Sequence, residues 1–220
     1  MTTSGTTDFT LDIADVIDEA FERVGVEMRT GFELRSARRS LNLLFAEWAN
    51  RGVNRWTIKQ TSVPTVVGQI EYPLGADTVD ILSATLRRDN VDLNMIRLSR
   101  DEYLNLPNKD TQGRPSQFYV DRQIDPVLKV WFAPDRVTDT IIYDRLTRIQ
   151  DAGSYTNTAD MPFRFYEPMV AGLAAKLAVK YAVERVQLLT SLYEEAFRLA
   201  AEEDRDRASL RVEPFGGFGL

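Results

Sequence analysis

The sequence predicts an α+β fold: a helical bundle made from the N- and C-terminal helices, with an inserted, mainly antiparallel β region. Two observations lead to this prediction. Apolar residues recur at steps of three and four in residues 10–52 and again in residues 163–208, as they do on one face of an α-helix. Between these segments, residues 57–148 hold short runs rich in β-branched and aromatic residues, separated by Pro, Gly, Asp and Asn.

The first predicted helix covers residues 10–24. Its apolar face is formed by Ile13, Val16, Ile17, Ala20, Phe21 and Val24. Thr10 is a candidate N-cap, and Gly25 is a candidate for the left-handed residue that follows a helix. Residues 1–9 are mostly small and polar, so we expect a flexible N-terminal arm before this helix.

The second predicted helix begins near Leu34 and ends near Gly52. Its apolar face is formed by Leu34, Ala37, Leu41, Leu44, Phe45 and Trp48. This face needs a partner, which either the first helix or the alanine-rich C-terminal helices can provide. The other side carries a basic patch of Arg35, Arg38 and Arg39.

The β region is expected to contain seven short strands and one short helix. The strands are predicted at residues 57–63, 69–73, 78–87, 93–98, 116–121, 127–133 and 137–146. The helix is predicted at residues 100–106, where Ser99 and Glu102 have the spacing of a capping box.

Helical periodicity returns after the polar segment 150–159. Met169, Leu173, Leu177 and Tyr181 form one apolar stripe, and Leu188, Leu192, Phe197 and Leu199 continue it. The pattern leaves open whether this is one helix or two, although Ser191 and Glu194 could cap a new start. We expect one domain over residues 10–208, followed by a separate tail at 209–220.

The composition excludes several kinds of active site. The 220 residues include no cysteine and no histidine, which removes disulfides, thiolate nucleophiles, zinc sites built from Cys or His, and imidazole catalysis. We expect no cofactor and no metal. The net charge of −6 argues against a free-standing nucleic-acid binder, because Lys and Arg provide most of the non-specific affinity for phosphates. No run approaches the roughly 20 apolar residues that cross a bilayer, and residues 1–10 lack the pattern of a signal peptide.

Four groups of residues follow one another in a pattern that one family of proteins shares. They are residues 41–44 with Glu47, Trp48, Gly52 and Trp56; residues 68–69 with 72–74; residues 99–103 with 113–115 and 118–119; and residues 128–135 with 141–145. Over residues 10–205 the chain resembles the head-to-tail adaptor proteins of short-tailed bacteriophages, also called tail accessory factors or packaged-DNA stabilisation proteins. It departs from the family pattern at Ala133, where the family often has Pro.

The resemblance implies a structural protein of the virion. Members of this family form a twelve-fold ring that docks beneath the portal protein, extends the DNA channel, helps to retain packaged DNA and carries the tail nozzle and the fibres or spikes. Double-stranded DNA passes through such a ring without specific binding. The implied location is the head–tail interface of the virion, with the host cytoplasm before assembly. The acidic net charge is consistent with a conduit, because a lumen that repels phosphate does not retard DNA.

The basic patch has three interpretations. Arg35, Arg38 and Arg39 can form a solvated helix face, they can pair with the acidic face of the first helix in a neighbouring subunit, or they can contact DNA. The acidic residues in question are Asp15, Asp18, Glu19 and Glu22. Pairing between subunits, with Asp15, Asp18 and Glu22 as the main partners, is the functional hypothesis that we carry forward.

The tail carries apolar residues that an exposed chain end does not need. Pro214, Phe215, Phe218 and Leu220 are candidates for docking onto the portal or a neighbouring subunit. The alternative is a disordered end.

An enzyme is the alternative function, and a carbohydrate-active, cell-wall-degrading enzyme is its most specific form. The candidate carboxylates are Asp101 with Glu102, Glu194 with Glu195, and Glu202 with Glu203 and Asp204. Adjacent residues on a helix point about 100° apart, so none of these groups is arranged to flank a glycosidic bond. We therefore expect no catalytic residues.

Overall fold

The computed structural model describes residues 5–6, 9–27, 31–53 and 55–204. Close contacts along the chain divide it into two compact units. The helical unit combines the described residues up to Leu44 with those from Pro162 onward, and the strand unit is Phe45–Met161. Helices and mainly antiparallel sheets together confirm the α+β prediction.

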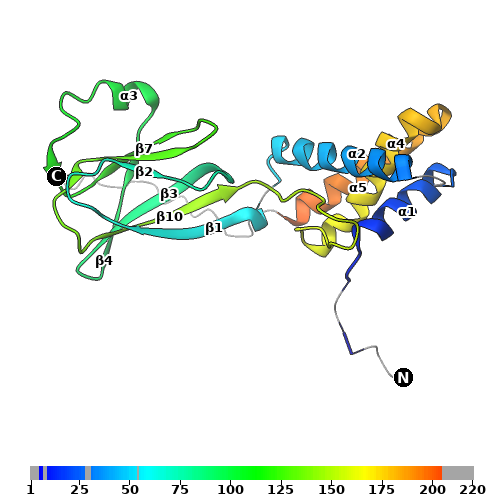
Figure 1. Ribbon diagram of the computed structural model, residues 1–220, viewed down its shortest axis with the longest axis horizontal. Helices are drawn as coiled ribbons and strands as arrows, with labels where there is room; N and C mark the ends of the chain where they lie inside the picture. The colour runs from blue at the N-terminus through cyan, green and yellow to red at the C-terminus, as the bar shows by residue number, and fades with distance from the viewer. Residues whose placement is uncertain (1–4, 7–8, 28–30, 54, 205–220) are drawn as a thin grey trace, which may run out of the picture. The chain divides into compact units, whose positions relative to one another are not determined.

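The helical unit is built around α4 (Tyr166–Tyr181). This helix packs against α1 (Ile13–Val24) and α5 (Val186–Glu203), and α2 (Gly31–Asn50) lies in the same group of helices (Figure 1). Almost every side chain between Pro168 and Ala178 is buried, because small residues on α4 allow its neighbours to approach closely. At Gly172 a Cβ atom would lie 2.9 Å from the side chains of Leu44 and Tyr193. At Gly172, α4 therefore packs too closely against Leu44 and Tyr193 to leave room for a side chain.

The two ends of α1 follow from local chemistry. The helix begins after Asp12, whose backbone N–H donates to the Asp15 carboxylate at 3.1 Å, so the prediction of Thr10 as the cap was wrong by two residues. Gly25 follows the helix with φ +78°, as predicted. The Arg185 guanidinium occupies the space where a Gly25 side chain would point, and it donates to the Arg23 carbonyl at 3.4 Å.

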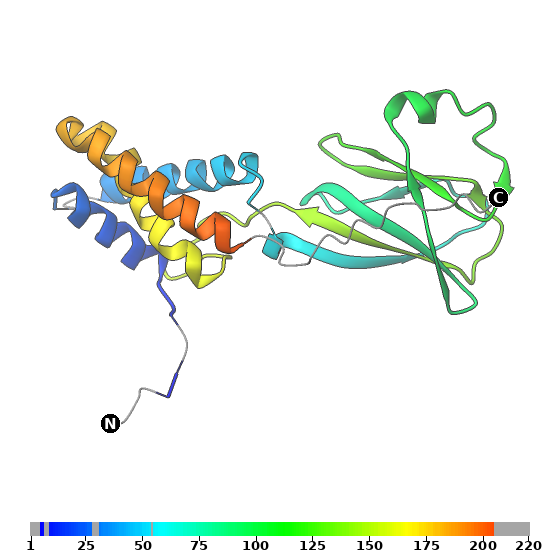
Figure 2. The same cartoon turned by 180° about the vertical axis from the view of Figure 1, so that it is seen from behind.

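The C-terminal segment forms two helices. The break is at Ala182, with φ −150° and ψ 70°, followed by the short 3₁₀ helix η3 (Val183–Arg185). The prediction that Ser191 could cap the start of a second helix was wrong. Ser191 lies inside α5, and its hydroxyl donates to the Leu188 carbonyl. Figure 2 shows α5, in orange, along the near side of the helical unit.

Polar side-chain contacts connect the helices. The Arg23 guanidinium donates to the Glu167 carboxylate at 2.6 and 2.9 Å and joins α1 to α4. The Lys180 ammonium group donates to the hydroxyls of Ser36 and Ser40 at 3.0 and 2.6 Å and joins α4 to α2. These contacts give the buried serine hydroxyls of α2 a partner.

The strand unit is a sandwich of two four-stranded sheets. The first has the order β1 (Ile58–Pro64), β10 (Thr140–Thr147), β3 (Thr78–Arg88) and β4 (Val91–Asn94), all antiparallel. The second has the order β2 (Glu71–Pro73), β8 (Val127–Trp131), β7 (Gln117–Asp121) and β5 (Ile96–Arg97), in which only β5 and β7 pair in parallel. A short parallel pair joins β6 (Gln112–Gly113) to β9 (Ala133–Pro134). Figures 1 and 2 show β1, β10 and β3 side by side.

Side chains from both sheets meet in one core. Ile81, Leu86 and Ile141 come from the first sheet, and Phe118 and Leu128 come from the second. Alternation along β7 and β8 sends every second side chain into this core. The core therefore explains why the two sheets pack face to face.

Turn residues set where the strands end. Asp89 and Asn90 both have positive φ, at 52° and 62°, and they connect β3 to β4 in the conformation of a two-residue hairpin turn. The predicted strand at 93–98 is divided into β4 and β5, which belong to different sheets. The capping box of the short helix α3 (Arg100–Leu104) is confirmed: the Ser99 N–H donates to the Glu102 carboxylate at 2.7 Å, and the Glu102 N–H donates to the Ser99 hydroxyl at 3.3 Å.

A buried ion pair lies at one end of the first sheet. The Asp139 side chain is 1% exposed, and its Oδ2 atom accepts hydrogen bonds from Arg88 Nε and Nη2 at 2.8 and 2.6 Å. Arg88 also pairs with Asp135, whose pKa it holds below the usual range. The Asp139 carbonyl accepts the Thr65 N–H at 3.0 Å. One arginine thus balances two carboxylates, one of them inaccessible to water.

Candidate interaction surfaces

The outward face of α2 combines positive charge with apolar residues. Arg35 and Arg39 are exposed, and Arg38 is half-buried. Phe32 and Leu43 are 65% and 61% exposed. Steps of three, four and four residues connect Phe32, Arg35, Arg39 and Leu43, so these side chains share one face of the helix.

The opposite side of α2 holds this face in place. Ser36 and Ser40 are buried and accept hydrogen bonds from Lys180. Burial lowers the pKa of the Lys180 ammonium group, and the positive charge of Arg39 lowers it further. The hydrogen bonds from Lys180 to Ser36 and Ser40 therefore fix the rotation of α2 about its axis. This rotation determines the direction in which the arginines point.

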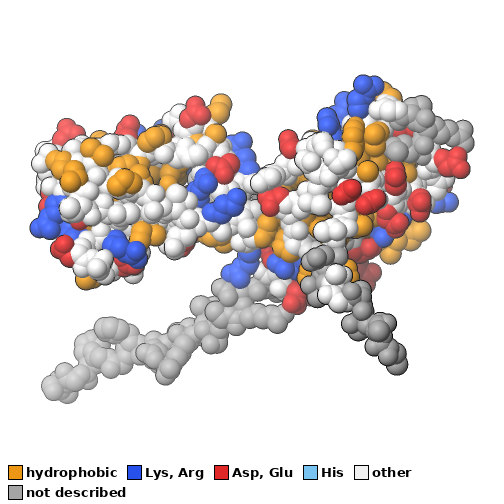
Figure 3. Space-filling model, turned by 60° about the horizontal axis from the view of Figure 1, so that its bottom comes forward, with side chains coloured by type: hydrophobic (Ala, Val, Ile, Leu, Met, Phe, Trp, Pro, Cys, Tyr) orange, Lys and Arg blue, Asp and Glu red, His pale blue; other side chains and the backbone are white. Residues whose placement is uncertain are grey.

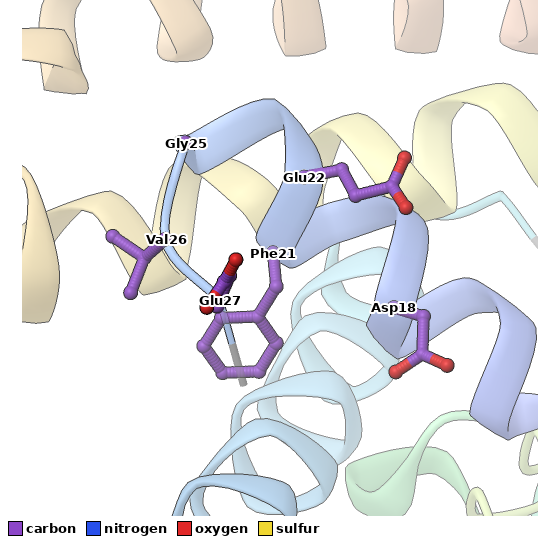
Figure 4. Close-up of a pocket in the computed structure, with 6 residues that line it drawn as sticks. All are labelled: Asp18, Phe21, Glu22, Gly25, Val26 and Glu27. Carbon is purple, nitrogen blue, oxygen red and sulfur yellow. The ribbon is translucent and has the colours of Figure 1, made fainter. Parts of the chain in front are cut away.

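The acidic face of α1 is also exposed. Asp15, Asp18 and Glu22 are all exposed, at steps of three and four residues along one side of the helix. Asp18 and Glu22 line an open hollow of about 580 Å³ at the end of α1, together with Phe21, Gly25, Val26 and Glu27. Figure 4 shows the carboxylate groups of Asp18 and Glu22 projecting away from the α1 ribbon. Neither carboxylate pairs with Arg35 or Arg39 within the described part of the chain.

A third exposed face lies on α5, where the sequence pattern predicted a buried face. Leu188, Leu192 and Leu199 were expected to continue the buried stripe, but they are 60%, 49% and 54% exposed. The buried side of α5 is instead formed by Leu189, Tyr193, Phe197 and Ala200. The offset arises at the break after Tyr181, because η3 changes the rotation of α5 relative to the periodicity of α4. Leucines without a partner on an outward face are typical of an interaction surface.

The predicted docking residues Pro214, Phe215, Phe218 and Leu220 lie outside the described residues. The predicted arm at residues 1–9 is described only at residues 5, 6 and 9.

Three of the candidate catalytic carboxylates have structural partners. Glu102 caps α3, and its pKa is lowered by the hydrogen bonds from the backbone N–H and the hydroxyl of Ser99. Glu202 pairs with Arg198 at 2.9 Å. Asp204 is buried and pairs with Arg164. Among the residues that the structure describes, no group of acidic side chains is arranged to hold a metal ion.

The tryptophans are packed or hydrogen-bonded. Trp48 is completely buried. The indole N–H of Trp56 donates to the Asp160 carbonyl at 2.8 Å, and that of Trp131 donates to the Asn108 carbonyl at 3.0 Å. Trp48 is therefore a core residue, whereas Trp56 and Trp131 are half-buried.

Charged groups of both signs are distributed over the surface. Figure 3 shows several acidic side chains gathered on one face of the helical unit, with hydrophobic side chains scattered over both units. In the described ranges, none of the helices has the length and apolar character needed to cross a membrane.

Comparison with known protein families gives a match over most of the chain. The sequence profile of the family described as SU10 adaptor protein matches residues 11–214. The matched range includes all the described helices and strands. No curated protein matches the chain.

Proposed function

The chain belongs to the SU10 adaptor protein family, whose members are structural proteins of bacteriophages, and we propose that it forms the ring that joins the head to the tail. The single observation that carries this proposal is the family match over residues 11–214. The match agrees with the family that four sequence motifs indicated. The proposed ring is twelve-fold, as the resemblance implies, and docks beneath the portal protein.

In the proposed virion, the ring extends the DNA channel and helps to retain packaged DNA. A cyclic oligomer repeats each side chain once per subunit, so every lumen-facing carboxylate becomes a ring of negative charge. The net charge of −6 per subunit supports a channel through which DNA passes without specific binding. The tail nozzle and the fibres or spikes are the proposed partners below the ring. Before assembly, the subunit resides in the host cytoplasm.

The proposed role includes no catalytic step and no cofactor. Glu102, Glu202 and Asp204 each serve a cap or an ion pair, which supports a structural role for these carboxylates. The alternative of a cell-wall-degrading enzyme has no such support from the described residues.

Two exposed faces are proposed to take part in contacts between subunits. One carries Arg35, Arg38 and Arg39 on α2, and the other carries Asp15, Asp18 and Glu22 on α1. All of these side chains except the half-buried Arg38 are exposed, which supports this role because buried side chains would not be available to a neighbour. We further propose that residues 209–220 dock onto the portal through Pro214, Phe215, Phe218 and Leu220. Residues 10–208 form the adaptor domain in this proposal.

Mixing the purified protein with portal rings tests the function. Native mass spectrometry and negative-stain microscopy should show one ring of subunits on each portal. A variant truncated after residue 209 should remain a folded monomer by circular dichroism but fail to assemble. A full-length chain that stays monomeric in the presence of portals would contradict the proposal. A monomer without portals would not, because portal binding can supply the free energy of assembly.

A further inference from the structure

Two outward helix faces of this chain have matching spacing. On α2, the exposed apolar residues Phe32 and Leu43 are separated by eleven positions. On α5, Leu188 and Leu199 are also separated by eleven positions, with Leu192 between them. At 1.5 Å per residue, each face extends about 17 Å between its outer apolar side chains. A side-by-side contact between the two faces would bring the apolar ends of one helix onto those of the other.

The charges between these apolar residues have opposite signs. Arg35 and Arg39 lie between Phe32 and Leu43 on α2. Glu195 lies between Leu192 and Leu199 on α5, three and four positions from its neighbours on the same face, and it is exposed. A face that pairs with a copy of itself would set arginine against arginine, or glutamate against glutamate. The charge pattern therefore favours contact between two different faces.

We propose that α5 of one subunit packs its Leu188, Leu192, Glu195 and Leu199 face against the Phe32, Arg35, Arg39 and Leu43 face of α2 in a second copy of this chain. The inference rests on the proposed ring, for which it names the contact between neighbours. Because the two faces are different, the contact is heterologous, and a heterologous contact that closes on itself produces a ring.

The apolar residues distinguish this pairing from one between α2 and the acidic face of α1. Among the residues that the structure describes, the exposed side chains around Asp15, Asp18 and Glu22 include no large apolar residue. Exposed ion pairs alone contribute little to binding, whereas burying a leucine or phenylalanine side chain contributes more. Among the described faces of the helical unit, α5 is thus the better partner for Phe32 and Leu43.

Charge reversal in two separate variants tests the pairing. The first variant, Arg35→Glu with Arg39→Glu, reverses the face of α2. The second, Ser191→Arg with Glu195→Arg, reverses the face of α5 with the same four-residue spacing and keeps its leucines. Each variant is mixed with portal rings alone and then in a 1:1 mixture. The wild type and a control variant, Lys59→Glu with Asp125→Arg on the strand unit, are treated in the same way.

Each variant alone should lose ring formation by at least tenfold, because every contact then opposes like charges. The mixture should restore rings in which the two variants alternate, since reversed α2 meets reversed α5 and the remaining contacts are unchanged. Native mass spectrometry should then find equal numbers of the two variants in each ring. Circular dichroism checks that both variants remain folded.

Three results would overturn the pairing. The variants could assemble alone as well as the wild type, or the mixture could fail although both variants are folded. The third result would be ring formation when the α2 variant is mixed with a variant that carries both Asp18→Arg and Glu22→Arg. That result would assign the partner of the α2 face to α1. Failure of the wild type itself to assemble on portals would contradict the proposed function, and so the two failures are distinguishable.

Discussion

Replacing Arg88 with methionine tests the buried ion pair of the strand unit. The change removes the cation that faces Asp139, whose side chain is 1% exposed, and keeps an unbranched side chain of similar length. Asp139 Oδ2 would lose hydrogen bonds of 2.6 and 2.8 Å, while its Oδ1 atom is buried and already has no hydrogen-bond partner. Removing one partner of a buried pair destabilises a protein by about 3–5 kcal/mol. That loss is a large part of the roughly 5–15 kcal/mol that stabilises a typical domain.

Two further variants identify the cause of this loss. Adding Asp139→Asn to Arg88→Met removes the uncompensated charge, so we expect the double variant to be more stable than Arg88→Met by at least about 1 kcal/mol. Arg87→Met is the matched control, because Arg87 is the neighbouring residue on β3 and pairs with Asp92, which is 45% exposed. Solvent screens that pair, and the control should be close to the wild type.

Urea unfolding followed by tryptophan fluorescence measures the effect. Trp56 and Trp131 lie in the strand unit, whereas Trp48 lies near the C-terminal end of α2, so two of the three tryptophans report on the strand unit outside the helices. Far-UV circular dichroism follows the helices in the same samples. The reasoning would be refuted if Arg88→Met were no less stable than Arg87→Met, or if Asp139→Asn gave no recovery.

Two further predictions concern the helical unit. Gly172→Leu should destabilise it by about 1–3 kcal/mol or more, because the new side chain would overlap Leu44 and Tyr193. Gly172→Ala should lose less stability, since alanine favours the helix by about 1 kcal/mol over glycine. Thermal unfolding followed by circular dichroism at 222 nm measures both variants, and a leucine variant more stable than the alanine variant would contradict this order. The second prediction concerns Glu167, whose pKa is lowered from its ordinary value of 4.5 by hydrogen bonds from Arg23. A lowered carboxylate pKa adds stability above that value and loses it as the pH falls through the lowered pKa. Glu167→Gln should therefore reduce the loss of stability between about pH 5 and pH 3, measured as the decrease in melting temperature. The effect should be less than about 1 kcal/mol, because the Glu167 side chain is 61% exposed. If the melting temperature of the variant depended on pH as that of the wild type does, the contact between Arg23 and Glu167 would be excluded as a source of this loss.

Local signals in the sequence identified the elements that depend on local chemistry. Ser99 and Glu102 predicted the start of α3, and Gly25 predicted the end of α1, because caps and left-handed residues act within a few positions. Ala182 was not recognised as a helix end. Alanine is the best helix former, so the break depends on tertiary contacts such as that of Arg185 with the end of α1.

The candidate surface was predicted only in part. The exposure of Arg35 and Arg39 followed from the apolar face on the other side of α2. The outward face of α5 was missed because Leu188 and Leu192 fit the periodicity of α4, and only the three-dimensional break shows that they point to solvent. The pairing of strands into two sheets was also beyond sequence patterns, since it depends on contacts between distant segments.

The division of the helical unit in sequence has a consequence for its synthesis. Phe45–Met161 is continuous and can fold when it leaves the ribosome, but α1 and α2 need α4, which follows it. At about 5–20 residues per second, the ribosome needs on the order of 10 s to synthesise the intervening segment. During that time the apolar sides of α1 and α2 have no partner on the nascent chain. We expect chaperones to engage the chain in this interval, before α4 emerges.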